Sequence, residues 1–205
     1  LDGRMGYQVF TEPLRGMSDR DREGMFRLRY DTFRVKLGWD VQTTDDGQEI
    51  DEFDAQPNAR YILAKSPDDG VDACWRLLPT TGPNMLRETF PQLLGGSSAP
   101  ESADCWELSR FALATGRLAA AEDAGNHQFG FGPLSVGMMV EAARFARANG
   151  IARYVTVTTT AIERMLKKQR VHIHRVGPAP VRIGNVMTVA CFIEVDDETL
   201  QAIGL

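Results

Sequence analysis

The chain has 205 residues, of which 43% are hydrophobic and 25% charged, a balance typical of a globular domain rather than a disordered or fibrous protein. Its 23 basic and 28 acidic residues give a formal net charge of −5, which argues against a general nucleic-acid-binding protein. No apolar run approaches the roughly 18 residues that a membrane-spanning helix needs. We therefore expect a single domain over residues 1–205, with no membrane span and no nucleic-acid partner.

The N-terminal sequence and the cysteines indicate a compartment. The segment Leu1–Phe10 lacks a charged start followed by an apolar run, so no signal peptide is predicted. The chain does not begin with Met, and we expect residues 1–6 to be foreign to the natural protein or without a fixed structure. Cys74, Cys105 and Cys191 form no Cys-x-x-Cys pair, which favours free thiols in a reducing environment. We expect a cytoplasmic protein that is a monomer.

The front half of the chain predicts a helix, a loop and a hairpin. The helix begins at Ser18, a favourable cap, and continues to Leu37 with apolar residues at helical spacing. Residues 40–54 contain seven acidic side chains and no basic one, and they predict a loop. The β-like runs Arg60–Lys65 and Val71–Leu78 are joined by Ser-Pro-Asp-Asp-Gly, which predicts a hairpin.

The back half alternates strands and helices. Strands are predicted over Cys105–Ala112, Arg153–Thr160 and Val186–Val195, and helices over Pro133–Asn149 and Ala161–Gln169. This order favours a mixed α/β sheet in one domain.

Charged residues inside apolar elements are the first candidates for a site. Arg76, Glu107 and Arg110 interrupt apolar strands. A regular strand places Glu107 and Arg110 on opposite faces, and a bulge would bring them together. Buried charges must be paired, so one interpretation is a structural network of these three residues with Asp51. The same network is also what an enzyme needs to bind a zwitterion and tune a base, and both interpretations stay open.

The first helix and the acidic loop supply further candidates. The simplest interpretation of an Arg on an apolar helix face, such as Arg29, is that it reaches solvent. Glu49 and Glu52 are expected to be solvated, whereas one or both of Asp51 and Asp54 turn inward beside the apolar Phe53. No His lies nearby and the spacing is not that of a calcium loop, so we predict no metal.

Five short motifs follow one another in a specific order. They are Arg29-x3-Phe33-x5-Trp39, Asp51-x2-Asp54, Arg76-Leu-Leu-Pro, Phe90 in Glu-Thr-Phe-Pro, and Trp-Glu107-Leu-Ser-Arg110-Phe. From Met25 to Val195 the chain thereby resembles the acyl-homoserine lactone synthases, the autoinducer synthases of bacterial quorum sensing. The resemblance implies an α/β fold similar to the GCN5-related N-acetyltransferases, a single domain with a splayed central sheet flanked by helices.

The resemblance also implies the chemistry. The substrates would be S-adenosylmethionine and an acyl thioester on acyl carrier protein or coenzyme A, with no metal or other cofactor. The α-amine attacks the thioester, and the carboxylate then displaces methylthioadenosine to close the lactone. The implied catalytic residues are Glu107 as the base, with Arg110, Asp51 and Arg76. The implied S-adenosylmethionine contacts are Arg29, Phe33, Trp39, Asp51, Asp54 and Arg110.

The acyl donor would contact two further sets of residues. By resemblance the acyl chain is lined by Phe90, Phe111, Met139, Thr156, Thr158 and Leu166. The run from Arg164 to Arg175 holds five basic residues and no acidic one. Such a run is either a solvated helix face or, in an acidic chain, a docking surface for the acidic acyl carrier protein, formed by Arg164, Lys167, Lys168 and Arg170.

Two alternatives to the synthase stay open at the level of sequence. One is a GCN5-like N-acyltransferase that acts on a different amine. The other is a non-catalytic acyl-carrier-binding or lipid-binding domain whose charged cluster is only structural. Formation of a lactone together with methylthioadenosine distinguishes the three.

Overall fold

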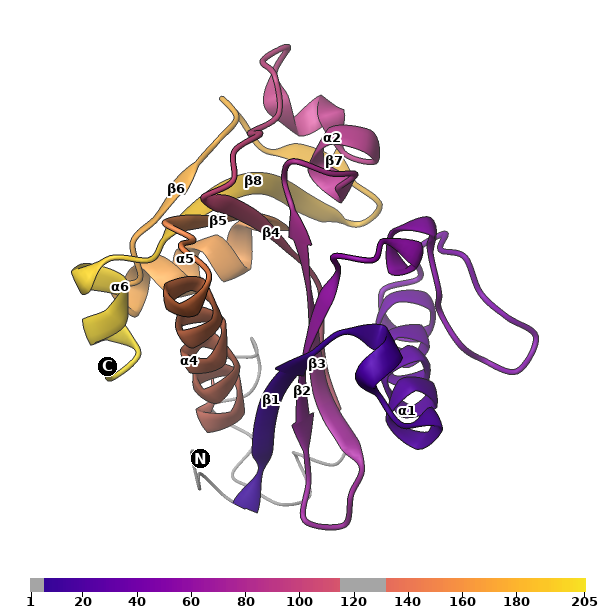
Figure 1. The fold of residues 1–205 in the computed structure, drawn as a ribbon. Coiled ribbons are helices and arrows are strands. Elements are labelled where there is room, and N and C mark those ends of the chain that lie inside the picture. The colour runs from indigo at the N-terminus through magenta and orange to yellow at the C-terminus, as the bar shows by residue number, and fades with distance from the viewer. Residues whose placement is uncertain (1–5, 115–131) are drawn as a thin grey trace. The chain divides into compact units, whose positions relative to one another are not determined.

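The computed structural model describes residues 6–114 and 132–205, so the expectation for residues 1–6 falls almost wholly outside the described residues (Figure 1). The chain divides into two compact units, Leu1–Arg76 with Arg110–Glu141 and Leu77–Ser109 with Ala142–Leu205. Strands β3 (Val71–Pro79) and β4 (Cys105–Leu113) contribute residues to both units. Within the described residues, no helix combines the length and apolar character needed to cross a membrane.

The first unit is built on the predicted hairpin. Strand β2 (Arg60–Lys65) leads into β3, and Ser66 N donates to Gly70 O at 2.9 Å to close the turn. Strand β1 (Gln8–Glu12), which the sequence did not predict, pairs antiparallel with β2.

The predicted first helix has the expected extent but two geometries. Helix α1 (Asp19–Arg29) begins after Ser18, whose hydroxyl accepts a hydrogen bond from Asp21 N at 3.1 Å. From Tyr30 to Lys36 the chain continues as a π-helix, in which Phe33 is the buried residue. π-helical turns are rare and frequently occur at functional sites, so the π-helix marks Phe33 as a candidate site residue.

The second unit contains the predicted alternation of strands and helices. Strand β4 runs parallel to β5 (Arg153–Thr159), and β5 pairs antiparallel with β8 (Val186–Glu194). Two short strands, β6 (Ile173–Arg175) and β7 (Val181–Ile183), also pair with β8. The predicted mixed sheet is confirmed.

Helices complete the two units. Helix α4 (Pro133–Ala148) matches its prediction and contributes to both units, and α5 (Thr160–Lys168) matches its own within one residue at each end. The short helices α2 (Met85–Glu88) and α6 (Asp197–Ala202) were not predicted, because a turn or two carries too little periodicity to recognise. In the second unit, Leu86 of α2 packs in a buried apolar cluster with Leu93, Val155 and Ala190.

Candidate functional site

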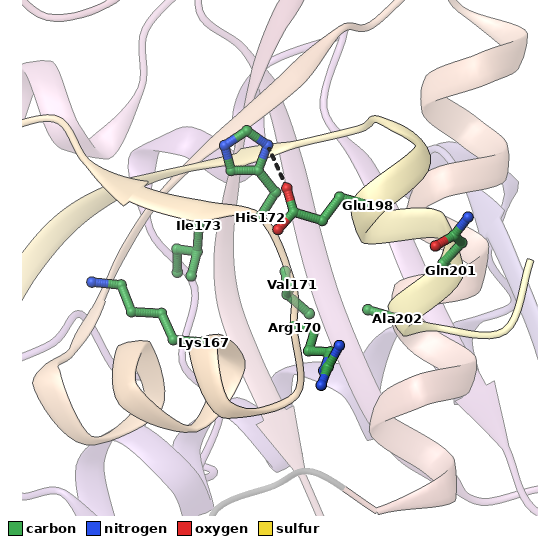
Figure 2. Close-up of a pocket in the computed structure, with 8 residues that line it drawn as sticks. All are labelled: Lys167, Arg170, Val171, His172, Ile173, Glu198, Gln201 and Ala202. Atoms are coloured by element: carbon green, nitrogen blue, oxygen red, sulfur yellow. Dashed lines mark ion pairs between the residues drawn. The ribbon is translucent and has the colours of Figure 1, made fainter.

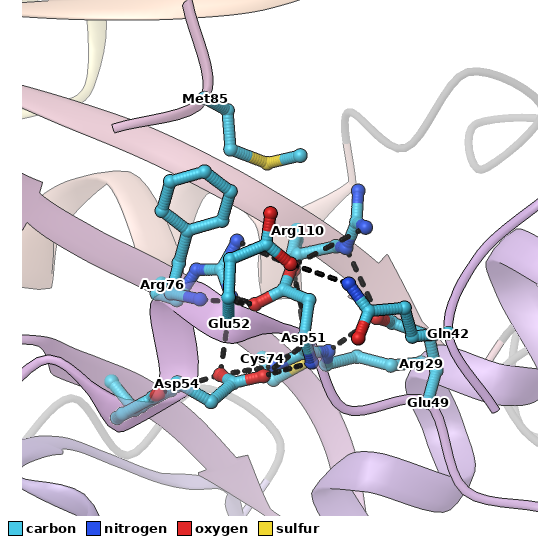
Figure 3. Close-up of polar contacts among 12 residues, drawn as sticks. Arg29, Gln42, Glu49, Asp51, Glu52, Asp54, Cys74, Arg76, Met85 and Arg110 are labelled. Atoms are coloured by element: carbon cyan, nitrogen blue, oxygen red, sulfur yellow. Dashed lines mark hydrogen bonds and ion pairs between the residues drawn. The ribbon is translucent and has the colours of Figure 1, made fainter. Parts of the chain in front are cut away.

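Three arginines and three carboxylates meet in the first unit (Figure 3). We call them the charged cluster: Arg29, Glu49, Asp51, Asp54, Arg76 and Arg110. All but Arg110 are buried, and the Arg110 side chain is only 7% exposed. With three charges of each sign, the cluster meets the requirement that buried charges be paired.

Arg29 lies at the end of α1 and is fully enclosed. Its Nε donates to Glu49 Oε1 at 2.8 Å, and its two terminal nitrogens donate to the oxygens of Asp54 at 2.8 and 2.9 Å. The expectation that this side chain reaches solvent is therefore wrong, since it is 1% exposed. Burial alone would lower the pKa of Arg29, but Asp54 and Glu49 raise it above its ordinary value.

Asp51 and Asp54 both turn inward; Asp51 precedes the short helical turn Glu52–Ala55 and Asp54 lies within it. They form a reciprocal capping box, and Asp54 also accepts a hydrogen bond from Tyr61 Oη at 2.6 Å. Arg76 Nη1 donates to Asp51 Oδ1 at 2.5 Å and to Asp54 Oδ1 at 3.1 Å. Burial would raise the pKa of Asp54, yet the guanidinium groups of Arg29 and Arg76 hold it well below its usual range.

Glu49 is the site residue that sequence reasoning missed. It was expected to be solvated, but its side chain is completely buried. Its Oε1 accepts from Arg29 Nε and from Arg110 Nε at 2.8 and 2.9 Å. Its Oε2 is buried without a hydrogen-bond partner among the described residues. Charge balance was the available signal, because three arginines in apolar elements require three carboxylates nearby.

Arg110 interrupts strand β4. Its φ is +56°, a left-handed conformation that costs a residue with a side chain about 1–2 kcal/mol and that bulged strands use to redirect a side chain. The guanidinium lies 5.0 Å from the centre of the Phe33 ring, which stacks on Trp39 at 5.5 Å. Burial, reinforced by the positive charges of Arg29 and Arg76, lowers the pKa of Arg110.

Glu107 belongs to the second unit and holds the start of α2. Its Oε1 accepts from Met85 N at 2.9 Å and its Oε2 from Leu86 N at 2.8 Å. These are two of the N–H groups that a helix start leaves without a partner inside the helix. Asn84 caps the same helix by accepting from Arg87 N.

The residues expected to contact the acyl chain fall into both units. Phe111, which meets Trp75 edge-on at 4.8 Å, and the buried Met139 belong to the first. Phe90, Thr156, Thr158 and Leu166 belong to the second. The hydroxyl of Thr156 donates to Leu108 O at 3.0 Å, so its hydrogen is already engaged.

The residues expected to dock a carrier are accessible. Arg164, Lys167, Lys168 and Arg170 are all exposed on or just after α5. Lys167 lies 3.7 Å from the carboxylate of the buried Glu163, which Arg175 also contacts through two hydrogen bonds. Elsewhere in the described second unit, His172, Asp196 and Glu198 place three potential ligand atoms within 4.8 Å of one another.

Comparison with known proteins identifies the family. The model of the autoinducer synthase family matches residues 14–203. An acyl-homoserine-lactone synthase from Aliivibrio fischeri is 36% identical over 200 residues, which cover 97% of this chain and 99% of the relative. The solved structure of the AHL synthase LasI has a TM-score of 0.80 and 35% identity over 97% of this chain and 93% of its own. TofI, solved with an inhibitor and MTA, has a TM-score of 0.77 and 34% identity over 97% of both chains. The expected GCN5-like fold and the resemblance are thus confirmed: the chain belongs to the autoinducer synthase family and is an acyltransferase, an acyl-homoserine-lactone synthase.

Proposed function

We propose that the protein makes its lactone from S-adenosylmethionine and an acyl chain carried by acyl carrier protein, with the charged cluster receiving the amino-acid end of S-adenosylmethionine. One observation carries this proposal. Among the described residues, Oε2 of Glu49 is buried without a hydrogen-bond partner, and the other oxygen of this carboxylate contacts Arg110, whose side chain remains 7% exposed. By contrast, each guanidinium nitrogen of Arg29 is paired within the cluster.

This unused capacity matches a zwitterion. A guanidinium receives a carboxylate, and a carboxylate receives an ammonium group, each through charge-assisted hydrogen bonds. The stacked Phe33 and Trp39 beside Arg110 offer an aromatic face for a sulfonium or an adenine ring. The ternary complex of the related TofI contains MTA, the by-product expected of this reaction. In the proposal, Arg29, Asp51, Asp54 and Arg76 hold Arg110 and Glu49 in position.

The proposed chemistry has two steps. The α-amine gives a proton to Glu107, directly or through water, and attacks the thioester carbon, so that the carrier leaves as a thiol. The carboxylate oxygen then attacks the γ-carbon and displaces methylthioadenosine as a neutral thioether. Neither step transfers electrons to a cofactor, and the second depends mainly on orientation because the sulfonium is already a good leaving group.

The proposed donor is an acyl carrier protein, supported by the exposed basic residues of α5. Arg164, Lys167 and Lys168 lie three and four residues apart and so share one helix face, in a chain of net charge −5. A single-sign patch of this kind steers an acidic partner. Phe90, Phe111, Met139, Thr156, Thr158 and Leu166 are proposed to contact the acyl chain. Three buried, unpaired cysteines support a reducing, cytoplasmic location for the enzyme, which we propose acts as a monomer.

The decisive experiment is product analysis. The protein is incubated with S-adenosylmethionine and a series of acyl chains on acyl carrier protein or coenzyme A, and mass spectrometry detects the products. We expect an acyl-homoserine lactone and methylthioadenosine in equal amounts, with carrier protein preferred over coenzyme A. Consumption of thioester without methylthioadenosine would instead indicate acylation of another amine. No lactone with any chain or carrier would overturn the proposal.

A further inference from the structure

Three metal-ligating side chains converge in the second unit. His172 Nδ1 lies 2.5 Å from Asp196 Oδ2 and 3.5 Å from Glu198 Oε2, and the three ligand atoms lie within 4.8 Å of one another. None of these residues is assigned to either substrate of the proposed reaction. Figure 2 shows the side chains of His172 and Glu198 directed toward each other beside a pocket.

The backbone around the three residues is well fixed. His172 lies between α5 and β6, and its N–H donates to Thr199 Oγ1 at 3.0 Å. Asp196 caps α6 by accepting from Thr199 N through Oδ1, which leaves its Oδ2 for His172. Thr199 therefore links the segment before β6 to the start of α6.

The local charge favours a cation. The neighbouring His174, whose ring centre lies 5.5 Å from that of His172, contacts a third carboxylate, Glu194, at 2.9 Å. Arg153 offsets part of this charge at Glu194. Lys167 and Arg170 line the adjacent pocket, which has a volume of about 520 Å³, but their charged ends lie away from the His172–Glu198 contact (Figure 2). His172 donates a hydrogen bond to Asp196, which raises the pKa of the imidazole, so a bound metal must displace that proton.

We propose that His172, Asp196 and Glu198 bind a divalent transition-metal ion of the zinc type. One imidazole and two carboxylates form a donor set that zinc accepts, and a three-ligand site keeps a position open for water. Two ligand atoms on one zinc ion lie about 3 to 3.5 Å apart, which the 3.5 Å separation of His172 Nδ1 and Glu198 Oε2 matches. The 2.5 Å contact of His172 with Asp196 is a hydrogen bond that must lengthen when the metal replaces its proton. Side chains that are 40% exposed permit this movement.

A metal at this position would join the C-terminal helix to the sheet. Asp196 and Glu198 belong to the cap and first turn of α6, whereas His172 immediately precedes β6. Binding would therefore stabilise the folded chain, because the unfolded chain does not hold the three ligands together. The open coordination position gives the metal access to water or to an anion from solution.

The experiment measures binding of the metal alone. Full-length protein, stripped with a chelator and dialysed, is titrated with Zn²⁺ by calorimetry, and with Co²⁺ to record its visible absorption. We expect one equivalent of metal, and a higher melting temperature in its presence. Asp196→Asn, which can still cap α6, and Glu198→Gln should each weaken Zn²⁺ binding by about 10-fold or more.

Two variants serve as controls. Asp197→Asn removes a neighbouring first-turn carboxylate that lies outside the group, and His174→Ala removes the second histidine. Both should retain full binding. Absence of stoichiometric binding to the wild type would overturn the proposal and leave a hydrogen-bonded His172–Asp196 pair. Equal weakening by Asp197→Asn would also overturn it, because such loss reflects only diffuse negative charge.

Discussion

At the scale of single residues, Glu49 has the most unusual environment in the charged cluster. One of its oxygens serves both Arg29 and Arg110, and the other is buried without a partner among the described residues. A buried acceptor without a hydrogen bond costs about 1–3 kcal/mol. A ligand ammonium that supplies the missing donor would recover this free energy on binding. The unpaired oxygen in the free enzyme would therefore increase the affinity for the substrate.

Replacement of Glu49 tests that interpretation. Glu49→Gln keeps the shape but removes the charge, so the KM for S-adenosylmethionine should rise about 10-fold or more, while the KM for the acyl donor changes little. The melting temperature should also fall, because Arg29 and Arg110 lose a buried counter-ion. Glu52→Gln is the matched control, since Glu52 is exposed in the same segment. A folded Glu49→Gln enzyme with an unchanged KM for S-adenosylmethionine would contradict the assignment.

Asp54 predicts an acid-dependent loss of stability. Because its native pKa lies well below its value in the unfolded chain, its contribution is complete above the unfolded pKa of about 4. As the pH falls below about 5, Asp54 becomes protonated in the unfolded state but stays ionised in the native state. The free energy of unfolding should therefore decrease. Urea titrations across this pH range measure the slope. Tyr61→Phe removes one hydrogen bond to Asp54 and should make the slope shallower.

At the scale of elements, Glu107 has two roles: it is the proposed base, and it also stabilises the start of α2. Glu107 accepts two N–H groups of this helix, so a variant can lose activity either by losing the base or by loosening α2. Asn84 separates the two effects, because it caps α2 without supplying the proposed base.

The corresponding prediction compares two variants. Glu107→Gln should reduce kcat by about 10²–10⁴-fold, the usual range for general acid–base catalysis, with S-adenosylmethionine binding retained. Asn84→Ala should lower the melting temperature by a comparable amount but keep most of the activity. Circular dichroism, calorimetric binding and single-turnover rates provide the measurements. Equal losses of activity in the two variants would show that Glu107 acts only through α2.

The basic residues of helix α5 test whether the acyl donor is an acyl carrier protein. Reversal of the exposed Lys167 and Lys168 to Glu should raise the KM for acyl carrier substrate, and more strongly at low salt, because screening weakens the attraction. The KM for S-adenosylmethionine should stay nearly constant. Reversal of Arg144 and Arg147, exposed on α4, gives the same change in net charge and serves as the control. An equal effect with a short carrier-free thioester would place the damage at the site rather than at docking.

At the scale of the whole molecule, the three cysteines report how the two units unfold. Burial raises the pKa of Cys74 and Cys191 to about 12 and that of Cys105 to about 11. Few thiolates exist at neutral pH, so native protein should resist iodoacetamide. Cys74 belongs to the first unit and the other two belong to the second.

Alkylation in increasing urea, followed by mass spectrometry, measures the opening of each unit. We expect all three cysteines to become reactive over one transition, because β3 and β4 contribute to both units and cannot unfold in one alone. Modification of Cys74 at clearly lower urea than the other two would show that the units unfold independently.

Local sequence determined most of the architecture and the family. Interactions between neighbouring residues set the cap at Ser18, the β2–β3 hairpin and the extent of α4 from its Pro to its Gly. The family motifs can be recognised from their order along the sequence alone. The tertiary structure decided which charges are buried. Arg29 and Arg110 contact Glu49 across 20 and 61 residues of sequence, and these contacts turned an expected solvent-facing Arg and a solvated Glu into buried partners. Left-handed Arg110 and the helix-capping role of Glu107 likewise depend on distant segments, because burial and charge pairing are set by what the fold brings together rather than by spacing along the chain.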